Sequence, residues 1–245
     1  MTRRAVLVAA LSVLLLPGLA TADSRASVVS HGDRSERTIA LTFDDGWGVK
    51  NCAKVVAILE RTATPATFLP SAHWVAAAPK FWRRVADRGF PFANHGVHHP
   101  RMTTLSYTAQ VRQIANARTV IERIIGKPML RLFRPPYGSY NEVTRAAAAA
   151  AGFPRLLLWD TTFADSARRP DGSLRPLSVY RRVASRGRNG SIILGHCGSS
   201  IDVAILAGVI SDYRRRGFTF VTIPELLDLP GALPMRFPPA TPPSS

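Results

Sequence analysis

The chain has 245 residues, enough for one substantial domain, and its hydrophobic content of 46% is ordinary for a globular protein. Its 32 lysines and arginines outnumber 16 acidic residues, which gives a net charge of +16. Such a surface favours anionic partners such as cell walls or phosphate polymers, although arginine that serves only solubility is the alternative. The arginines are spread along the chain without a zinc-finger or RNP-type motif, so we expect no nucleic-acid partner.

The first 22 residues have the pattern of a secretory signal peptide. Two arginines at positions 3 and 4 precede an apolar run over residues 5–16 and an Ala-Thr-Ala cleavage site that ends at Ala22. The run is shorter than the ~20 residues of a membrane span, so we expect cleavage and not an uncleaved anchor. Export by the general secretory route is favoured over the twin-arginine route. Cleavage lowers the net charge by the two arginines, and we expect no transmembrane anchor afterwards.

The remaining sequence predicts one folded domain, residues 38–232, between two polar ends. Residues 23–37 are polar and of mixed charge, which predicts a flexible segment. Residues 233–245 are rich in proline and serine and predict a disordered tail.

Within the domain, short apolar runs alternate with helical patterns. We expect strands at Thr38–Phe43, Ala66–Leu69, Phe90–Ala93, Leu130–Phe133, Arg155–Trp159, Ser191–Leu194 and Phe218–Thr222. The clearest helices are Ser106–Ile125, Asn141–Ala151 and Ile201–Arg216, and a glycine follows each of them directly. This alternation predicts an α/β fold with a parallel sheet or barrel, whose strands are buried on both faces.

Side chains able to do chemistry follow the ends of these strands. They are Asp44, Asp45, His95, His99, Arg134, Asp165 and His196. Because α/β barrels build their active sites at the carboxyl ends of the strands, this distribution predicts an active site at that edge.

The stretch ANHGVHHPRM, residues 93–102, holds three of the six histidines. His95 and His99, four residues apart, can face one side of a helical turn, while His98 points away. With Asp45 they form a set of two histidines and a carboxylate that suits Zn²⁺ or a similar divalent ion. A solvated loop or a pair of hydrogen-bonded core histidines is the alternative.

The adjacent carboxylates Asp44 and Asp45 have two interpretations. They can cap a helix or form an Asx-turn before Gly46. Alternatively they divide the chemistry, one binding a cation while the other acts as a base on water.

Five short motifs follow one another along the chain: TFDDG at 42–46, HGVHH at 95–99, RPPYG at 134–138, an acidic motif that ends at Asp165, and ILGH at 193–196. With these motifs in this order, residues 38–229 resemble the polysaccharide deacetylases, carbohydrate esterase family 4. The resemblance implies a single-domain, distorted and incomplete (β/α) barrel of about seven parallel strands. It also implies hydrolysis of the linear amide C–N bond that carries an acetyl group on a sugar.

The resemblance further implies that Asp45, His95 and His99 hold one divalent metal ion, foremost Zn²⁺, with Co²⁺ or Ni²⁺ as alternatives. The metal would polarise the acetyl carbonyl and activate a water, and Asp44 would be the base on that water.

Four further roles follow from the resemblance. Arg134 would fix and ionise Asp44. The main-chain N–H of Tyr137 would help to hold the negative oxygen of the tetrahedral intermediate. His196 would protonate the leaving amine, with Asp165 behind it.

The sequence departs from the family pattern at two motifs. Gly96 stands where the second motif usually has Ser or Thr, so one loop hydrogen bond is missing. The fourth motif has Thr162 and Ser166 in place of its first Asp and its Trp. Asp165 is then the best match for the acid behind His196, and Asp160 is the runner-up.

The acetyl pocket therefore needs another wall, for which Leu194 and Trp159 are the candidates.

Trp47 follows DDG where the family often has Pro. It either stacks on a sugar ring or packs against the protein.

The two cysteines, Cys52 and Cys197, are both expected at the catalytic rim, and exported proteins commonly form disulfides. A bridge needs Cα atoms within ~7 Å, which the separate strands before them need not provide.

Together these features predict a secreted or wall-associated, metal-dependent deacetylase, expected to be a monomer. Its preferred substrates are N-acetylglucosamine polymers of the bacterial cell wall, with chitin oligomers second, and the cationic surface would hold it on an anionic wall. The alternatives are an O-acetyl ester hydrolase of the acetylxylan type, a hydrolase of small cyclic amides, and an inactive carbohydrate-binding relative.

The signal-peptide assignment makes a prediction about export. We expect the exported protein to begin at Asp23, because the Ala-x-Ala site ends at Ala22. Mass spectrometry of protein recovered outside the cytoplasm would measure this start, and an intact Met1 would contradict it.

Overall fold

The structure is a computed structural model, which describes residues 25–163, 176–230, 235 and 237. The expected signal peptide, residues 1–22, lies outside the described residues. Of the helices within them, none combines the length and the apolar character that a membrane crossing requires.

The described residues form eight strands, all of them paired in parallel. The strands are β1 (Ser27–Val29), β2 (Thr38–Asp45), β3 (Ala66–Pro70), β4 (Leu132–Phe133), β5 (Arg155–Leu157), β6 (Thr161–Thr162), β7 (Ser191–His196) and β8 (Thr219–Val221). They make two sheets, one in the order β1-β5-β4 and one in the order β3-β2-β7-β6, with β8 also alongside β2.

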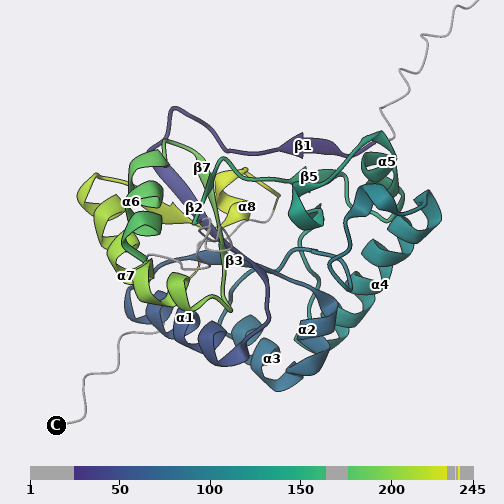
Figure 1. Cartoon of the computed structure of the whole chain (residues 1–245), viewed down its shortest axis with the longest axis horizontal. Coiled ribbons are helices and arrows are strands. Elements are labelled where there is room, and N and C mark those ends of the chain that lie inside the picture. The colour runs from purple at the N-terminus through teal and green to yellow at the C-terminus, as the bar shows by residue number, and fades with distance from the viewer. Residues whose placement is uncertain (1–24, 164–175, 231–234, 236, 238–245) are drawn as a thin grey trace, which may run out of the picture.

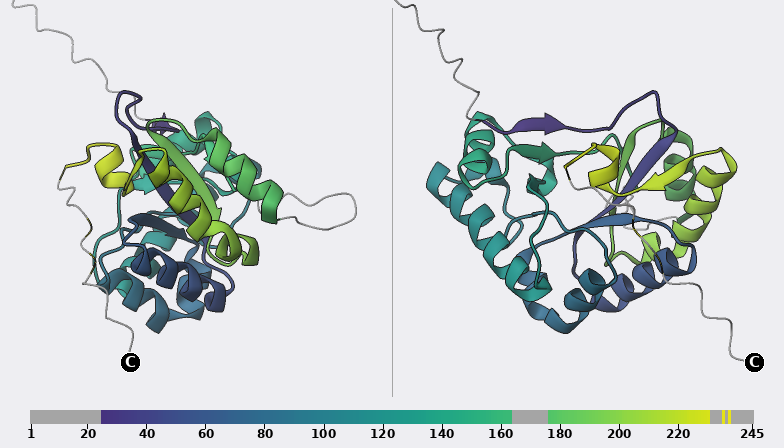
Figure 2. Two further views of the ribbon diagram at one scale, coloured as in Figure 1. Left: turned by 90° about the vertical axis from the view of Figure 1, so that its left-hand side faces the viewer. Right: turned by 180° about the vertical axis from the view of Figure 1, so that it is seen from behind.

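The helices surround these strands. They are α1 (Val49–Arg61), α2 (Ala72–Ala77), α3 (Pro79–Asp87), α4 (Tyr107–Ile125), α5 (Glu142–Ala150), α6 (Pro176–Arg186), α7 (Ser200–Arg215) and α8 (Ile223–Leu226), with 3₁₀ turns η1 (Met102–Thr104) and η2 (Pro136–Gly138). Figures 1 and 2 show most of them at the periphery and most strands inside, while β1 lies along the outer edge.

The predicted helices are present, and their ends follow the sequence signals. The Ser106 hydroxyl accepts from the third residue of α4, and Gly126 closes that helix with a left-handed φ of 72°. Asn141 caps α5 in the same way.

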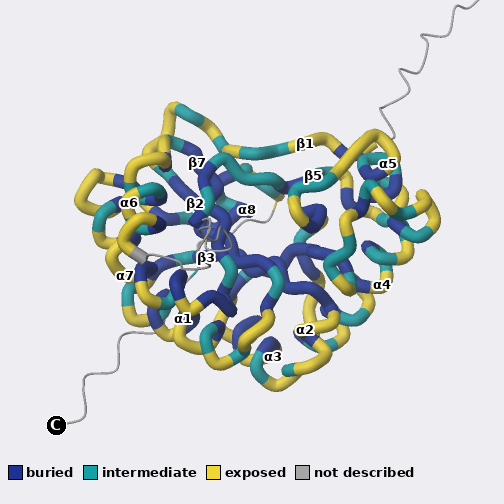
Figure 3. Tube along the Cα trace, viewed as in Figure 1, coloured by how far each residue is buried: buried dark blue, intermediate teal, exposed yellow. Residues whose placement is uncertain are grey.

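The strand β2 is the centre of the fold. Its residues 39–44 are all buried, and it pairs with β3, β7 and β8. Figure 3 shows this concentration of buried positions in the middle of the molecule, with exposed positions on the outer faces of the helices. The continuous apolar runs of the sequence reflect strands covered on both faces.

The expected strand at Phe90–Ala93 is not a regular strand, which corrects the prediction. Only isolated parallel bridges form there, at Phe92 with Phe68 and at Asn94 with Phe133. Pro91 has no N–H to donate to a ladder, although its carbonyl accepts from Phe68. The segment still joins the two sheets by these bonds.

This arrangement confirms the expected α/β fold as a distorted, incomplete (β/α) barrel. The two sheets meet through residues 90–94 on one side, while β5 and β6 are not paired. The carboxyl ends of the parallel strands consequently meet at one edge.

Residues 25–37 do not match the expectation of a flexible N-terminal segment. Ser27–Val29 form β1, which runs beside β5 in Figure 1. Further along, Arg34 Nη2 lies 2.6 Å from Asp160 Oδ2. A short strand of three residues with no alternating pattern left no signal in the sequence.

The predicted disordered tail, residues 233–245, lies outside the described residues except for Met235 and Phe237. Both of these pack against the hydrophobic core, and the Phe237 ring lies 6.0 Å from that of Phe90.

The two cysteines form a disulfide between the start of α1 and the loop after β7. The Cα atoms of Cys52 and Cys197 are 4.4 Å apart. They meet because β2 and β7 are neighbours, with Asp44 opposite His196 in the register. The bridge therefore links the helix that follows β2 to the loop that follows β7.

We predict that this disulfide contributes substantially to stability. It closes a loop with a sequence separation of 145 residues, so replacing both cysteines by serine is expected to lower the free energy of unfolding by about 2–5 kcal/mol. Chemical denaturation of the oxidised protein and of the double variant would measure the difference. Titration of two free thiols in unfolded, unreduced protein would contradict the bridge.

Candidate active site

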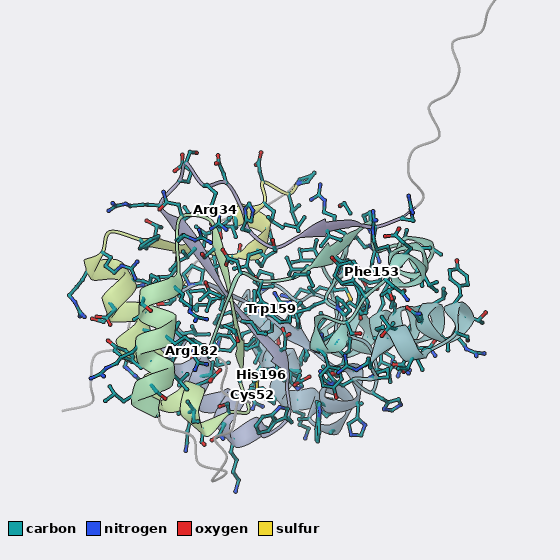
Figure 4. The ribbon with its side chains drawn as sticks, turned by 45° about the horizontal axis from the view of Figure 1, so that its top comes forward. Arg34, Cys52, Phe153, Trp159, Arg182 and His196 are labelled. Atoms are coloured by element: carbon teal, nitrogen blue, oxygen red, sulfur yellow. A yellow bond between two sulfur atoms is a disulfide. The ribbon has the colours of Figure 1, made fainter. Side chains whose placement is uncertain are left out.

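The predicted polar residues do gather at the carboxyl edge of the strands. Asp44 and Asp45 end β2, His196 ends β7, and Arg134 follows β4 directly. Figure 4 labels His196 in the central part of the molecule, with Cys52 just below it and Trp159 above.

The most buried polar contact in the site is the ion pair between Asp44 and Arg134. The Arg134 Nη1 donates to Asp44 Oδ1 over 2.6 Å, and the two side chains are 0% and 4% exposed. One carboxylate oxygen of Asp44 is thereby engaged. The other, Oδ2, faces His95 Nε2 at 3.8 Å.

Arg134 is held by a full set of acceptors. Its Nη1 also donates to Thr42 Oγ1 (2.9 Å), its Nε to the Leu157 carbonyl (3.0 Å) and its Nη2 to the Leu158 carbonyl (3.1 Å). The Trp159 ring lies beneath the guanidinium, 5.5 Å from Cζ. Burial lowers the pKa of Arg134, and the charge of Asp44 opposes that shift. These bonds fix the direction in which Asp44 points.

Asp45, His95 and His99 form the candidate metal centre. Their nearest ligand atoms all lie within 4.8 Å of one another. Asp45 Oδ1 is 3.4 Å from His95 Nε2 and 3.3 Å from His99 Nε2, and this buried oxygen has no hydrogen-bond partner among the described residues. A buried carboxylate oxygen facing two imidazole nitrogens is what a divalent cation would satisfy.

The ionisation of these groups agrees with a site for a cation. Burial acts to raise the pKa of Asp45, but the close approach and charge of His95, with the charges of His99 and His196, lower it to about 2. The pKa of His95 is raised, because the charges of Asp44 and Asp45 outweigh its burial. Burial and the charge of His95 lower the pKa of His99. Two carboxylates thus draw a positive charge to this position.

The orientation of His95 is fixed by a contact of its other ring nitrogen, Nδ1. Its Nδ1 lies 2.8 Å from the Arg134 carbonyl oxygen. That contact turns Nε2 toward Asp45, as a supporting acceptor does for a metal-binding histidine.

The loop between the two histidines replaces the hydrogen bond that Gly96 cannot make through a side chain. The Asn94 Oδ1 accepts the Gly96 N–H (2.8 Å), and Gln113 Oε1 of α4 accepts the N–H groups of Val97 and His98. Sequence reasoning missed Asn94 and Gln113. Only the position of Asn94, two residues before Gly96, gave a local signal, since Asn commonly bonds the main chain two residues on.

The turn at Asp45 is unusual in its backbone. Asp45 has φ of 64° and Gly46 has φ of 90°. A Cβ at residue 46 would lie 2.6 Å from Trp82 Cζ2, so this turn requires glycine. The left-handed backbone conformation of Asp45 allows the two adjacent carboxylates, Asp44 and Asp45, both to face the site.

The RPPYG turn presents Tyr137 to the site in a similar way. Tyr137 has φ of 61° and is 61% exposed, and its ring lies 4.4 Å from that of His99. Among the described residues, no hydrogen bond is donated by the Tyr137 main-chain N–H.

His196 lies across the site from the histidine pair, with Nε2 3.8 Å from Asp45 Oδ2. Its main-chain N–H donates to Asp202 Oδ2 (2.8 Å), a buried carboxylate of α7 that sequence reasoning missed. Asp165, the expected acid behind His196, lies outside the described residues. The runner-up, Asp160, is engaged elsewhere, with Arg34, Ser191 and the Ile192 N–H.

The three candidate pocket residues differ in exposure. Trp47 is 39% exposed, and a Cβ at residue 198 would lie 2.6 Å from its ring, so it packs on Gly198 while keeping an open face. Trp159 is half-buried against Gly138, and Leu194 on β7 is 5% exposed.

The comparison with known families decides the membership of the chain. Residues 31–156 match the model of the family described as polysaccharide deacetylase. The chain belongs to the polysaccharide deacetylase family. The resemblance carried by the five motifs is thereby confirmed, and structural neighbours are described as members of carbohydrate esterase family 4.

Two curated relatives and one solved structure illustrate the similarity. The chain is 27% identical to the peptidoglycan-N-acetylmuramic acid deacetylase PdaA of Bacillus subtilis, over 80% of this chain and 73% of the relative. It is 30% identical to a chitooligosaccharide deacetylase of Bradyrhizobium, over 80% and 94%. BA3943 of Bacillus anthracis, described as a pseudoenzyme of the same family, superposes with a TM-score of 0.76 at 25% identity, over 82% and 69%.

Proposed function

We propose that the protein is a secreted, metal-dependent hydrolase that removes acetyl groups from N-acetylated sugars. The observation that carries this proposal is the buried Asp45 Oδ1, which faces His95 and His99 beside the Asp44–Arg134 pair. The substrates we favour are N-acetylglucosamine polymers of the bacterial cell wall, followed by chitin oligomers. The relatives are named as deacetylases of peptidoglycan, at N-acetylmuramic acid or N-acetylglucosamine, and of chitooligosaccharides, which supports these classes of substrate.

Asp45, His95 and His99 would hold one divalent ion. Two imidazoles and one carboxylate with open positions suit Zn²⁺ best, with Co²⁺ or Ni²⁺ as alternatives. When bound, such an ion polarises a carbonyl and lowers the pKa of water.

Asp44 is the general base in this proposal. Arg134 occupies its Oδ1, so Oδ2 is the oxygen left to take a proton from the water that attacks the acetyl carbonyl carbon.

The main-chain N–H of Tyr137 is the proposed donor to the oxygen that becomes negative during attack. Its left-handed backbone turns the amide out of the regular 3₁₀ pattern, and no acceptor among the described residues competes for it.

His196 is the proposed acid. Cleavage of an amide needs a proton on the leaving nitrogen, and the imidazole Nε2 of His196 lies across the site from the histidine pair. The Asp202 carboxylate holds the main chain of His196 in place. Asp165 remains the proposed partner that keeps the imidazole charged.

Trp159 and Leu194 are the proposed wall for the acetyl methyl group, and the exposed face of Trp47 is the proposed platform for a sugar ring. The excess of positive charge would hold the protein on an anionic wall.

The adjacent carboxylates provide the sharpest test. Asp45→Asn removes a charged ligand, so metal content and the rate of acetate release should fall together, with partial rescue by excess metal. Asp44→Asn should retain metal and lose about 10²–10⁴-fold in rate without rescue, the range expected for loss of a general base. Elemental analysis beside deacetylation assays on N-acetylglucosamine oligomers, peptidoglycan and acetylxylan would measure both.

The outcomes separate the alternatives. Release of acetate from acetylxylan alone would indicate an ester hydrolase, and metal-free wild-type protein that binds glycan without releasing acetate would indicate an inactive relative. If Asp44→Asn emptied the site while Asp45→Asn stayed loaded, the two roles would be reversed.

A further inference from the structure

An arginine stands at the mouth of the site with no role in the proposed chemistry. Arg101 follows the second motif, and its Cζ lies over the exposed Tyr137 ring, 5.0 Å from the centroid. The same ring lies 4.4 Å from the His99 ring. One aromatic ring therefore separates the guanidinium from a candidate metal ligand.

The segment that carries Arg101 is fixed. Arg101 directly precedes η1, whose Met102 is fully buried, and its carbonyl accepts from the N–H and hydroxyl of Thr104. The next residue, Thr103, shares a hydrogen bond of 2.8 Å with Ser139 at the end of the RPPYG turn. The backbones beneath Arg101 and Tyr137 are thus tied together, which pre-organises the pair.

The charge of Arg101 is not balanced within the described residues. None of the ion pairs among the described residues involves Arg101, and Arg101 is exposed at the edge of the site. Arg134, by contrast, has its carboxylate partner in Asp44. Stacking on a ring face leaves the edge of a guanidinium, with its N–H groups, available to a planar anion.

We propose that Arg101 is a specificity-determining residue that binds a carboxylate on the substrate sugar, close to the acetamido group being cleaved. This inference rests on the proposed function. Within the cell-wall polymer it moves the preferred target from N-acetylglucosamine, which has no carboxylate, to an N-acetylhexosamine with a carboxyalkyl ether next to its acetamido group, the chemistry of muramic acid.

Two ring contacts connect Arg101 with the candidate metal centre: His99 packs on Tyr137, and Tyr137 packs on Arg101. An acetyl group at that centre would lie beside His99, so a substituent on the same sugar is the group that Arg101 would meet. A carboxylate on the neighbouring ring carbon would meet the guanidinium edge in a charge-assisted, bidentate hydrogen bond. A neutral chitin-type sugar has no group for this position.

A matched pair of disaccharides tests the assignment. N-Acetylglucosaminyl-N-acetylmuramic acid and N,N′-diacetylchitobiose differ mainly in the acidic ether. For Arg101→Gln we expect the ratio of kcat/KM, acidic over neutral sugar, to fall by about 10-fold or more, since a hydrogen bond to a charged group is lost. Arg101→Lys should restore part of the ratio, and added salt should lower it in the wild type.

Arg123→Gln is the matched control. Arg123 is exposed on α4, roughly 24 Å along the helix from its start at about 1.5 Å per residue. This variant removes the same charge far from the site, so the ratio should stay at the wild-type value. An unchanged ratio in Arg101→Gln, or an equal fall in Arg123→Gln, would overturn the inference.

Failure of the proposed function is distinguishable from failure of this inference. If wild-type protein loaded with Zn²⁺ releases acetate from neither disaccharide, the proposed function fails. Calorimetric titration of both disaccharides then tests Arg101 by itself. The inference predicts tighter binding of the acidic sugar by wild type and a loss of that preference in Arg101→Gln, and equal binding of the two sugars by wild type would refute it.

Discussion

The buried pair of Arg134 and Asp44 is the interaction on which both the fold and the site depend. Asp44 belongs to β2 of one sheet, while Arg134 follows β4 of the other, so the contact joins the two halves of the open barrel. A buried charge is tolerated only when it is paired and its remaining donors are satisfied. Thr42 and the carbonyls of residues 157 and 158 satisfy them here.

The same constraint organises the candidate chemistry. Arg134 takes one oxygen of Asp44 by its side chain and holds His95 by its carbonyl, so a single residue aims both the proposed base and one metal ligand. The disulfide and the packing of Trp47 on Gly198 fix the opposite side of the site, where His196 lies. Such rigid support is what a site needs to hold groups in reacting positions.

Much of this arrangement could be predicted from the sequence, for physical reasons. Polar residues directly after apolar runs meet at one edge whenever the strands are parallel, so Asp44, Asp45 and His196 were predictable neighbours. The long helix α4 was equally plain, because its apolar stripe is bounded by a serine cap and a glycine.

The rest depends on tertiary contacts that leave no local pattern. Residues 90–94 follow a strand-like course interrupted by Pro91, and β1 is three residues long. The loop at Gly96 is held by hydrogen bonds from Asn94 and Gln113, which lie 19 residues apart in the chain. Asp160 likewise pairs with Arg34 across the fold. The disulfide does not follow from the sequence either, because chain order does not reveal which strands are neighbours in a sheet.

The central claim, that Asp45, His95 and His99 hold a catalytic cation, can be tested most directly by anomalous scattering. Crystals grown with Zn²⁺ and measured on both sides of the zinc absorption edge should give one strong peak among these three residues. The ion should lie about 2.0–2.2 Å from a carboxylate oxygen and two imidazole nitrogens. An active protein whose only zinc peak lies elsewhere, with the three side chains bonded to one another, would contradict the account.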